Sequence, residues 1–226
     1  MRTINVAIDG PAGAGKSSIA KAVAKNLGYV YVDTGALYRS VAYYAISNKI
    51  KPDDAPNVCK LLSGLDVQLK FINGQQRVFV AGEDVSDKIR TPEVSMGSSA
   101  VSAIPEVRNF LFDLQKKIAS ENNIIMDGRD IGTVVLPDAQ LKIFLTASAE
   151  ERARRRYEEI KNFQEGISFE NILSDIIRRD QNDMNRAVAP LKQADDAILV
   201  DSTDMGIDQV ISHIENLINN IDKQRG

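Results

Sequence analysis

The sequence of 226 residues predicts an α/β fold built around a five-stranded parallel sheet that is flanked by helices. Two observations support this prediction. Short apolar runs rich in β-branched residues are each followed by polar residues or glycine, and helical patterns separate these runs. A third observation, one segment in which polar and apolar residues alternate, predicts a small antiparallel β insertion in addition to the sheet.

The first three predicted elements are a strand, a glycine-rich loop and a helix. Residues 3–8 form a β-branched apolar run, and residues 16–27 carry apolar side chains at helical spacing. Gly28 stands where a glycine that ends a helix belongs. Residues 29–32 form a second apolar run, which stops at the polar residues 33–35, where we expect a loop.

Three more strands complete the predicted sheet, at residues 124–126, 141–145 and 198–200. A helix over residues 105–118 has one apolar stripe and a proline in its first turn. A C-terminal helix over residues 207–221 has an apolar face of nearly four turns, which we expect to pack on the sheet. Ser148 with Glu151 matches a capping box and predicts the start of an arginine-rich helix after the fourth strand.

The alternating segment predicts an antiparallel hairpin. Apolar and polar side chains alternate over residues 67–72, and Asn73-Gly74 favours a type I′ turn that leads the chain into Val78 and Val80. Such a hairpin does not belong inside a parallel sheet, so residues 62–91 are predicted to be an insertion.

Composition and charge exclude several classes of protein. With 43% hydrophobic and 26% charged residues, the chain is neither disordered nor fibrous, and we expect one enlarged domain over residues 1–226. The net charge of −3 lacks the basic excess of nucleic-acid binders, so we expect no nucleic-acid partner. A lone cysteine, Cys59, excludes disulfide scaffolds, and no Cys/His cluster has the spacing of zinc ligands. Neither a membrane-spanning run nor a signal peptide is recognisable, so we expect a cytoplasmic protein without membrane contact.

Residues 10–17 read GPAGAGKS and match G-x-x-x-x-G-K-[ST] between a predicted strand and a predicted helix, the context that this motif requires. Glycines let successive backbone N–H groups turn toward phosphate oxygens, and the following helix adds its positive N-terminal end. We therefore predict a phosphate loop that binds a nucleoside triphosphate. The residues expected to hold it are Gly10, Pro11, Ala12, Gly13, Ala14, Gly15, Lys16, Ser17 and Ser18.

Ser17 and Asp127 are candidates for contact with Mg²⁺, directly or through water. The Ser17 hydroxyl can take one position in the octahedral shell of the ion, while Lys16 reaches the β- and γ-phosphates. Asp127, at the end of a predicted strand, can orient water bound to the metal. A helix cap or turn role is the alternative for Asp127.

A phosphate loop fits switches, motors, translocases and kinases alike, and the arginines favour a kinase. Ligands of open α/β sheets lie at the carboxyl ends of the strands, so arginines that follow strands converge near the transferring phosphates. A second phosphate-bearing substrate needs such guanidinium clamps, because two anions must be held in line despite their repulsion. No Asn-Lys-x-Asp motif is present, which argues against a GTPase switch.

Three further stretches resemble bacterial cytidylate kinases, enzymes that move the γ-phosphoryl group of ATP to CMP and dCMP. They are DTGALYR at residues 33–39, DGRDIGTVV at residues 127–135 and NRAVAPL at residues 185–191, and the resemblance covers essentially the whole chain. It implies a phosphate-loop kinase in which the hairpin insertion belongs to the monophosphate-binding region and residues 152–187 form a helical lid.

The resemblance also implies roles for individual residues. The positions that match the family's CMP contacts are Thr34, Arg39, Ser99, Arg108, Arg129, Asp130, Arg179, Asp183 and Arg186. Arg39, Arg129 and Arg186 would grip the acceptor phosphate, Arg179 and Asp183 would reach the ribose, and Asp130 with Arg108 and Ser99 would read cytosine. The catalytic candidates are Lys16, Arg129, Arg186, Arg152 and Arg156, the last two from the lid.

Two alternatives stay open at this point. One is a kinase for another nucleoside monophosphate or small acceptor, and the other is a nucleotide-dependent switch that has no second substrate. The partners expected for the kinase are ATP, CMP or dCMP and Mg²⁺, and we expect the protein to be a monomer.

Overall fold

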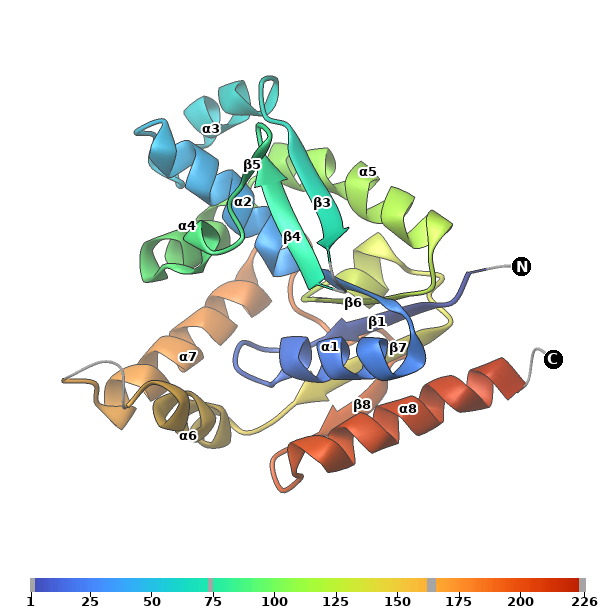
Figure 1. Ribbon diagram of the computed structural model, residues 1–226. Helices are drawn as coiled ribbons and strands as arrows, with labels where there is room; N and C mark the ends of the chain where they lie inside the picture. The colour runs from blue at the N-terminus through green and yellow to red at the C-terminus, as the bar shows by residue number, and fades with distance from the viewer. Residues whose placement is uncertain (1–2, 73–74, 162–165, 224–226) are drawn as a thin grey trace. The chain divides into compact units, whose positions relative to one another are not determined.

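The computed structural model describes residues 3–72, 75–161 and 166–223 (Figure 1). The chain forms two compact units. The first consists of Met1–Val30 together with Asn123–Gly226, and the second is the continuous segment Tyr31–Asn122 between them in the sequence.

A parallel sheet in the order β2-β6-β1-β7-β8 confirms the predicted five strands. Strand β1 (Asn5–Asp9) pairs with β6 (Ile124–Gly128) on one side and with β7 (Leu141–Thr146) on the other. β7 also pairs with the edge strand β8 (Ile198–Asp201). At the other edge, β2 (Val30–Asp33) begins where the Val30 N–H donates to the Asn123 carbonyl. Ala7, Ile8, Ile125 and Met126 are fully buried, as expected for central parallel strands.

In the described part of the first unit, four α-helices accompany this sheet. They are α1 (Lys16–Leu27), α6 (Ala149–Ile160), α7 (Phe169–Asn185) and α8 (Ile207–Lys223). α1 and α8 pack against each other, and Val23, Ile214 and Ile218 are buried (Figure 1). Gly28 ends α1 with a φ of 70°, which confirms the predicted glycine stop.

The predicted capping box at the start of α6 forms only in part. The Ser148 hydroxyl accepts a hydrogen bond from the Glu151 N–H at 3.1 Å, as expected. The Ser148 N–H donates instead to the Thr203 hydroxyl, and the Glu151 carboxylate accepts from Arg154 and Arg155. The reciprocal half of the box was wrongly predicted, because two neighbouring guanidinium groups compete for the carboxylate.

The second unit contains the helices α2 (Thr34–Ser47), α3 (Ala55–Leu62), α4 (Pro92–Ser102) and α5 (Pro105–Glu121), with a short 3₁₀ turn at Lys88–Arg90. Its antiparallel sheet, in the order β3-β4-β5, confirms the predicted insertion. The strands are β3 (Val67–Ile72), β4 (Gln75–Val80) and β5 (Glu83–Asp84). The type I′ turn expected at residues 73–74 lies outside the described residues. Leu37, Val101, Val107 and Leu111 are fully buried in the core of this unit.

Residues 33–35 do not form the expected loop, because α2 begins at Thr34 directly after β2. The Asp33 carboxylate accepts a hydrogen bond from the Ala36 N–H at 2.9 Å, so it serves as the N-cap. The short polar stretch that ends the strand therefore also starts a helix.

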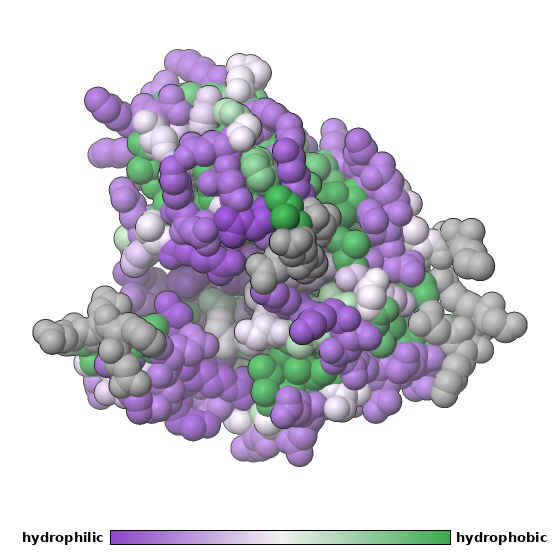
Figure 2. All heavy atoms as spheres, viewed as in Figure 1, coloured by the Kyte–Doolittle hydropathy of each residue, from purple (hydrophilic) through white to green (hydrophobic). Residues whose placement is uncertain are grey.

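Hydrophilic residues cover most of the face in Figure 2, and exposed hydrophobic residues lie in small groups among them. The described residues include no helix whose length and apolar content would allow it to cross a membrane.

Candidate active site

The phosphate loop connects β1 to α1 through backbone conformations that favour glycine. Gly10, Gly13 and Gly15 have φ angles of 147°, 77° and 82°. A Cβ atom on Gly10 would lie 1.9 Å from the Leu145 carbonyl oxygen, so β7 leaves no room for a side chain. Gly15 precedes α1 without a side-chain cap, and the first N–H groups of the helix remain for an anion.

Lys16 lies at the first position of α1 and is only 5% exposed. Its ammonium group donates a hydrogen bond to the Pro11 carbonyl at 2.7 Å, inside the loop. Burial, followed by repulsion from Arg129, lowers the pKa of Lys16 from 10.5 to about 7, although nearby carboxylates including Asp127 oppose this shift. A phosphate group that replaced the carbonyl would favour the charged form.

Ser17 and Asp127 meet at the carboxyl edge of the sheet. The Ser17 hydroxyl donates to the Asp127 carboxylate at 2.7 Å, and Asp127 is 4% exposed near the end of β6. Hydroxyl and carboxylate oxygens suit Mg²⁺. Among the described residues no three His, Cys, Asp or Glu side chains form a metal-binding group, so phosphate oxygens and water would have to supply the other ligands. Ser18, on the next position of α1, is exposed.

Asp9, the last residue of β1, holds the segment that follows β6. Its carboxylate accepts hydrogen bonds from the N–H groups of Ile131 at 2.8 Å and Gly132 at 2.7 Å. These residues begin a π-helical turn, Ile131–Val135. Burial raises the pKa of Asp9 to about 6, against the lowering effect of its two backbone hydrogen bonds. No sequence pattern pointed to Asp9, because an aspartate at the end of a strand has no distinctive motif.

Arg129, Asp130, Asp183 and Arg186 form two ion pairs in the first unit. Arg129 donates to Asp183 at 2.7 Å, and Arg186 donates to Asp130 at 3.2 Å. Asp130 and Asp183 are 4% and 8% exposed. The structure therefore brings together residues that are more than fifty positions apart in the sequence.

Arg179 lies one turn before Asp183 on α7. Desolvation lowers the pKa of Arg179 and repulsion from Arg129 lowers it further, although the residue keeps an exposed surface. The excess of guanidinium groups makes this cluster suitable for a phosphate.

The two lid candidates lie in different environments. Arg152 is 5% exposed, and protein groups occupy its guanidinium: it donates to the carbonyls of Ala147 and Ala12 and to the Asp180 carboxylate. The Arg156 side chain is 57% exposed and pairs with Glu159 on the same face of α6. Contact of either arginine with a transferring phosphoryl group stays a prediction.

In the second unit, Asp33 connects the start of α2 to Arg39. Arg39 donates to the Asp33 carboxylate at 2.8 Å, and its Nε atom is buried without a hydrogen-bond partner among the described residues. The Gln76 amide accepts from the Asp33 N–H at 2.9 Å, so the β insertion helps to fix this corner. Thr34, directly after the cap, is 3% exposed.

Ser99 and Arg108 both form hydrogen bonds with Ser102, the last residue of α4. Arg108 is 7% exposed and donates to the Ser102 carbonyl at 3.4 Å, while the Ser102 hydroxyl donates to the Ser99 carbonyl. The guanidinium of Arg108 also lies 5.7 Å from the centre of the Tyr38 ring. Ser102 thus links Ser99 to Arg108, and Arg108 also reaches Tyr38 on α2, the helix that carries Thr34 and Arg39.

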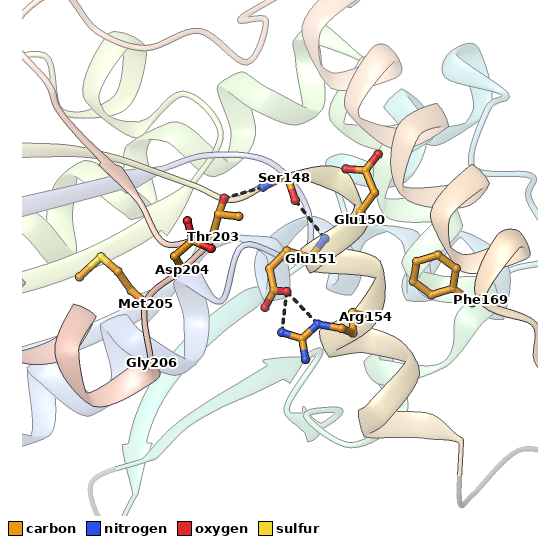
Figure 3. Close-up of a pocket in the computed structure, with 9 residues that line it drawn as sticks. All are labelled: Ser148, Glu150, Glu151, Arg154, Phe169, Thr203, Asp204, Met205 and Gly206. Atoms are coloured by element: carbon orange, nitrogen blue, oxygen red, sulfur yellow. Dashed lines mark hydrogen bonds and ion pairs between the residues drawn. The ribbon is translucent and has the colours of Figure 1, made fainter.

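A cavity of about 640 Å³ lies in the first unit between the start of α6 and the segment that joins β8 to α8 (Figure 3). Its lining residues are Ser148, Glu150, Glu151, Arg154, Phe169, Thr203, Asp204, Met205 and Gly206. In Figure 3 the Arg154 guanidinium points toward Glu151, which accepts two hydrogen bonds from it. Arg154 and Phe169 lie in the predicted lid, residues 152–187, but no lining residue is among the nucleotide-binding or catalytic residues predicted from the sequence.

Comparisons with known proteins identify relatives over nearly the whole chain. The family model described as cytidylate kinase matches residues 6–220. A cytidylate kinase of Caldicellulosiruptor bescii is 52% identical over 96% of both chains, and one of Caldicellulosiruptor saccharolyticus is 50% identical over the same shares. A solved structure of an uncharacterized protein from Eubacterium ventriosum has a TM-score of 0.51 at 14% identity, with 97% of this chain and 99% of that chain covered, which shows the fold alone.

Proposed function

Because the chain belongs to the cytidylate kinase family, we propose that its phosphate loop and arginine pairs transfer the γ-phosphoryl group of ATP to CMP. The observation that carries this assignment is the presence, in one unit, of a phosphate loop and two arginine–carboxylate pairs whose carboxylate residues are buried. We extend the proposal to dCMP, since no residue is assigned to the ribose 2′-hydroxyl alone.

On the donor side, the backbone N–H groups of residues 10–18 and the end of α1 cradle the triphosphate. Lys16 leaves the Pro11 carbonyl and places its ammonium between the β- and γ-phosphates. Ser17 would hold Mg²⁺ directly and Asp127 through water, and the ion when bound neutralises phosphate charge. The base of ATP would occupy the cavity of Figure 3. Helix α6 lines that cavity and also contacts the phosphate loop, because Arg152 donates to the Ala12 carbonyl.

On the acceptor side, Arg39, Arg129 and Arg186 bind the phosphate of CMP. The buried Nε of Arg39, which has no partner among the described residues, supports this role, because such a donor is costly unless a ligand accepts from it. Arg179 and Asp183 bind the ribose. Asp130, Arg108 and Ser99 read the donor and acceptor pattern of cytosine, and Thr34 adds a hydroxyl at the same site.

The transfer needs positioning and neutralisation of charge more than a general base, because the attacking group is an anionic phosphate oxygen. Lys16, Arg129 and Arg186 stabilise the charge that spreads over the transferring group. Arg156, with an exposed side chain on α6, joins them when α6 and α7 cover the nucleotides as a lid. Cytoplasmic location, monomeric state and absence of a nucleic-acid partner complete the proposal and fit a chain with one cysteine and a net charge of −3.

A panel of acceptors tests the assignment. Release of ADP is measured at fixed ATP and Mg²⁺ with CMP, dCMP, UMP, AMP and GMP. We expect CMP and dCMP to give the highest kcat/KM, because the base site offers a carboxylate to the cytosine amino group. A higher kcat/KM with any of the other three would contradict the proposal.

Asp130→Asn tests the base site separately. The amide replaces an acceptor with a donor near the cytosine amino group, so kcat/KM for CMP should fall about 10- to 100-fold while KM for ATP stays within about threefold. Asp138→Asn, an exposed carboxylate of the same unit, is the matched control and should behave as the parent. Unchanged CMP kinetics in the Asp130 variant would remove this residue from the base site.

A further inference from the structure

Arg152 joins three segments of the first unit that are far apart in the sequence. Its Nε donates to the Ala147 carbonyl at 2.9 Å, one terminal nitrogen donates to the Ala12 carbonyl at 2.8 Å, and the other donates to Asp180 at 2.6 Å. Arg152 and Asp180 are 5% and 8% exposed. The guanidinium is therefore buried, and its hydrogen bonds connect the phosphate loop to the helices α6 and α7.

The hydrogen bond from Arg152 to the Ala12 carbonyl determines the orientation of the peptide group between Ala12 and Gly13. In a planar trans peptide the C=O and N–H bonds point in opposite directions, and no cis peptide occurs among the described residues. With the Ala12 oxygen held toward Arg152, the Gly13 N–H points away from α6 and α7. Gly13 itself is exposed, whereas Ala12 and Ala14 are buried.

Gly13 does not by itself fix the orientation of the peptide group between Ala12 and Gly13. Gly13 has a φ of 77°, so the residue has the conformational freedom of a glycine in the left-handed region. A Cβ on Gly13 would lie 3.4 Å from the Arg152 Cβ and 3.8 Å from Ile176, so the loop packs directly on both helices. A carbonyl that turned toward the nucleotide in place of the N–H would repel phosphate oxygens.

We propose that Arg152 is a positioning residue: it holds the Ala12 carbonyl and so presents the Gly13 N–H to the phosphates of the nucleotide. Asp180 balances the buried charge and fixes the guanidinium, and its second carboxylate oxygen is buried without a partner in the described part of the chain. This inference rests on the proposed function of the loop, and it differs from direct contact of Arg152 with the transferring phosphoryl group.

The test compares ADP binding by calorimetry in the double variant Arg152→Met/Asp180→Asn, in Arg178→Met and in the parent. The double variant leaves no uncompensated buried charge. It loses the Ala12 contact, so we expect ADP to bind about tenfold more weakly or worse, which is the size of one lost hydrogen bond to a charged group. Arg178→Met, which removes an exposed arginine of α7, is the matched control and should stay within about threefold of the parent.

The Gly13 amide resonance supplies a readout that a purely structural role would not move. Its proton should shift downfield when ADP binds to the parent and should not shift in the double variant, while the Gly15 amide responds in both. If the double variant does not fold, Arg152→Lys replaces it, because an ammonium paired with Asp180 cannot also reach Ala12, and the same loss of the Gly13 shift is expected.

Two results would overturn the inference. One is parent-like ADP affinity with a kcat lowered about 10³- to 10⁵-fold, which direct contact with the transferring group would give. The other is parent-like ADP affinity together with parent-like kcat. Failure of the proposed function is distinguishable, since a protein that binds ADP as described but prefers another acceptor fails only the acceptor panel.

Discussion

At the level of single residues, burial lowers the pKa of Lys16 and so changes its acid–base chemistry. An exposed lysine remains charged at neutral pH, but Lys16 is buried beside Arg129 and its pKa is lowered to about 7. Above pH 7 the free protein therefore favours the neutral amine. A bound diphosphate favours the ammonium form and raises the pKa again, so nucleotide binding and protonation are linked.

We expect ADP binding at pH 8 to take up about one proton, because Lys16 is mostly neutral in the free protein and charged in the complex. Calorimetry in buffers of different ionisation enthalpy measures this uptake. Lys16→Arg is the control, since its guanidinium stays protonated at pH 8 and should show no uptake. Equal uptake by the parent and the variant would contradict the linkage.

The phosphate loop, as an element, depends on close packing of its first residue against the neighbouring strand. Gly10 follows β1, and β7 approaches so closely that any side chain would meet the Leu145 carbonyl. Gly28, at the other end of α1, also has a positive φ of 70°, but a Cβ added there would meet no atom of the described residues within 4 Å. A side chain at Gly28 would cost backbone strain alone, whereas a side chain at Gly10 would cost backbone strain together with a steric clash.

Gly28→Ala should lower the free energy of unfolding by about 1 kcal/mol, the usual cost of a side chain in the left-handed region. Gly10→Ala adds a backbone clash, so we expect a further loss of about 1–3 kcal/mol together with weaker ADP binding. Urea denaturation and calorimetry on both variants give the comparison. Equal stability of the two variants would contradict the role assigned to β7.

At the scale of the whole molecule, one chain supplies every residue assigned to the two nucleotides. Exposed large hydrophobic side chains occur on several elements of the described chain, including Met96 on α4, Ile177 on α7 and Leu199 on β8. Ile198 and Leu199 are adjacent on the edge strand and are 39% and 56% exposed, which makes this edge the obvious place for a second copy to pair.

We expect a monomer in which that edge is unused. Sedimentation equilibrium should give the mass of one chain, and activity per chain should not change when the enzyme is diluted. Leu199→Lys, which places a charge on the edge strand, should leave both results unchanged. Activity that falls on dilution in the parent would show that an assembly is required.

Local patterns determined much of the fold in advance. The five strands were predicted because each is a short, mainly apolar run, and the phosphate loop because its glycines and lysine lie within one short motif. Burial of all five strands was wrongly predicted, since three of the four residues of the edge strand β8 are exposed. α2 was not predicted: its buried residues, including Ala36, Leu37 and Val41, lie around much of the helix and so give no clear polar face. The same apolar burial that stabilises the helix removes the periodicity by which it could be recognised.

By itself, the sequence determined the alternation of strands and helices, the phosphate loop and the family to which the chain belongs, because these depend on residues that are close together in the chain. Only the tertiary structure decided what the isolated charged residues contact. Arg152 reaches Ala12 across 140 positions and Asp180 across 28, and Asp9 reaches Gly132 across 123. Hydrogen bonds over such separations follow from how the chain packs, since the parallel sheet brings its loops to one edge wherever they stand in the sequence.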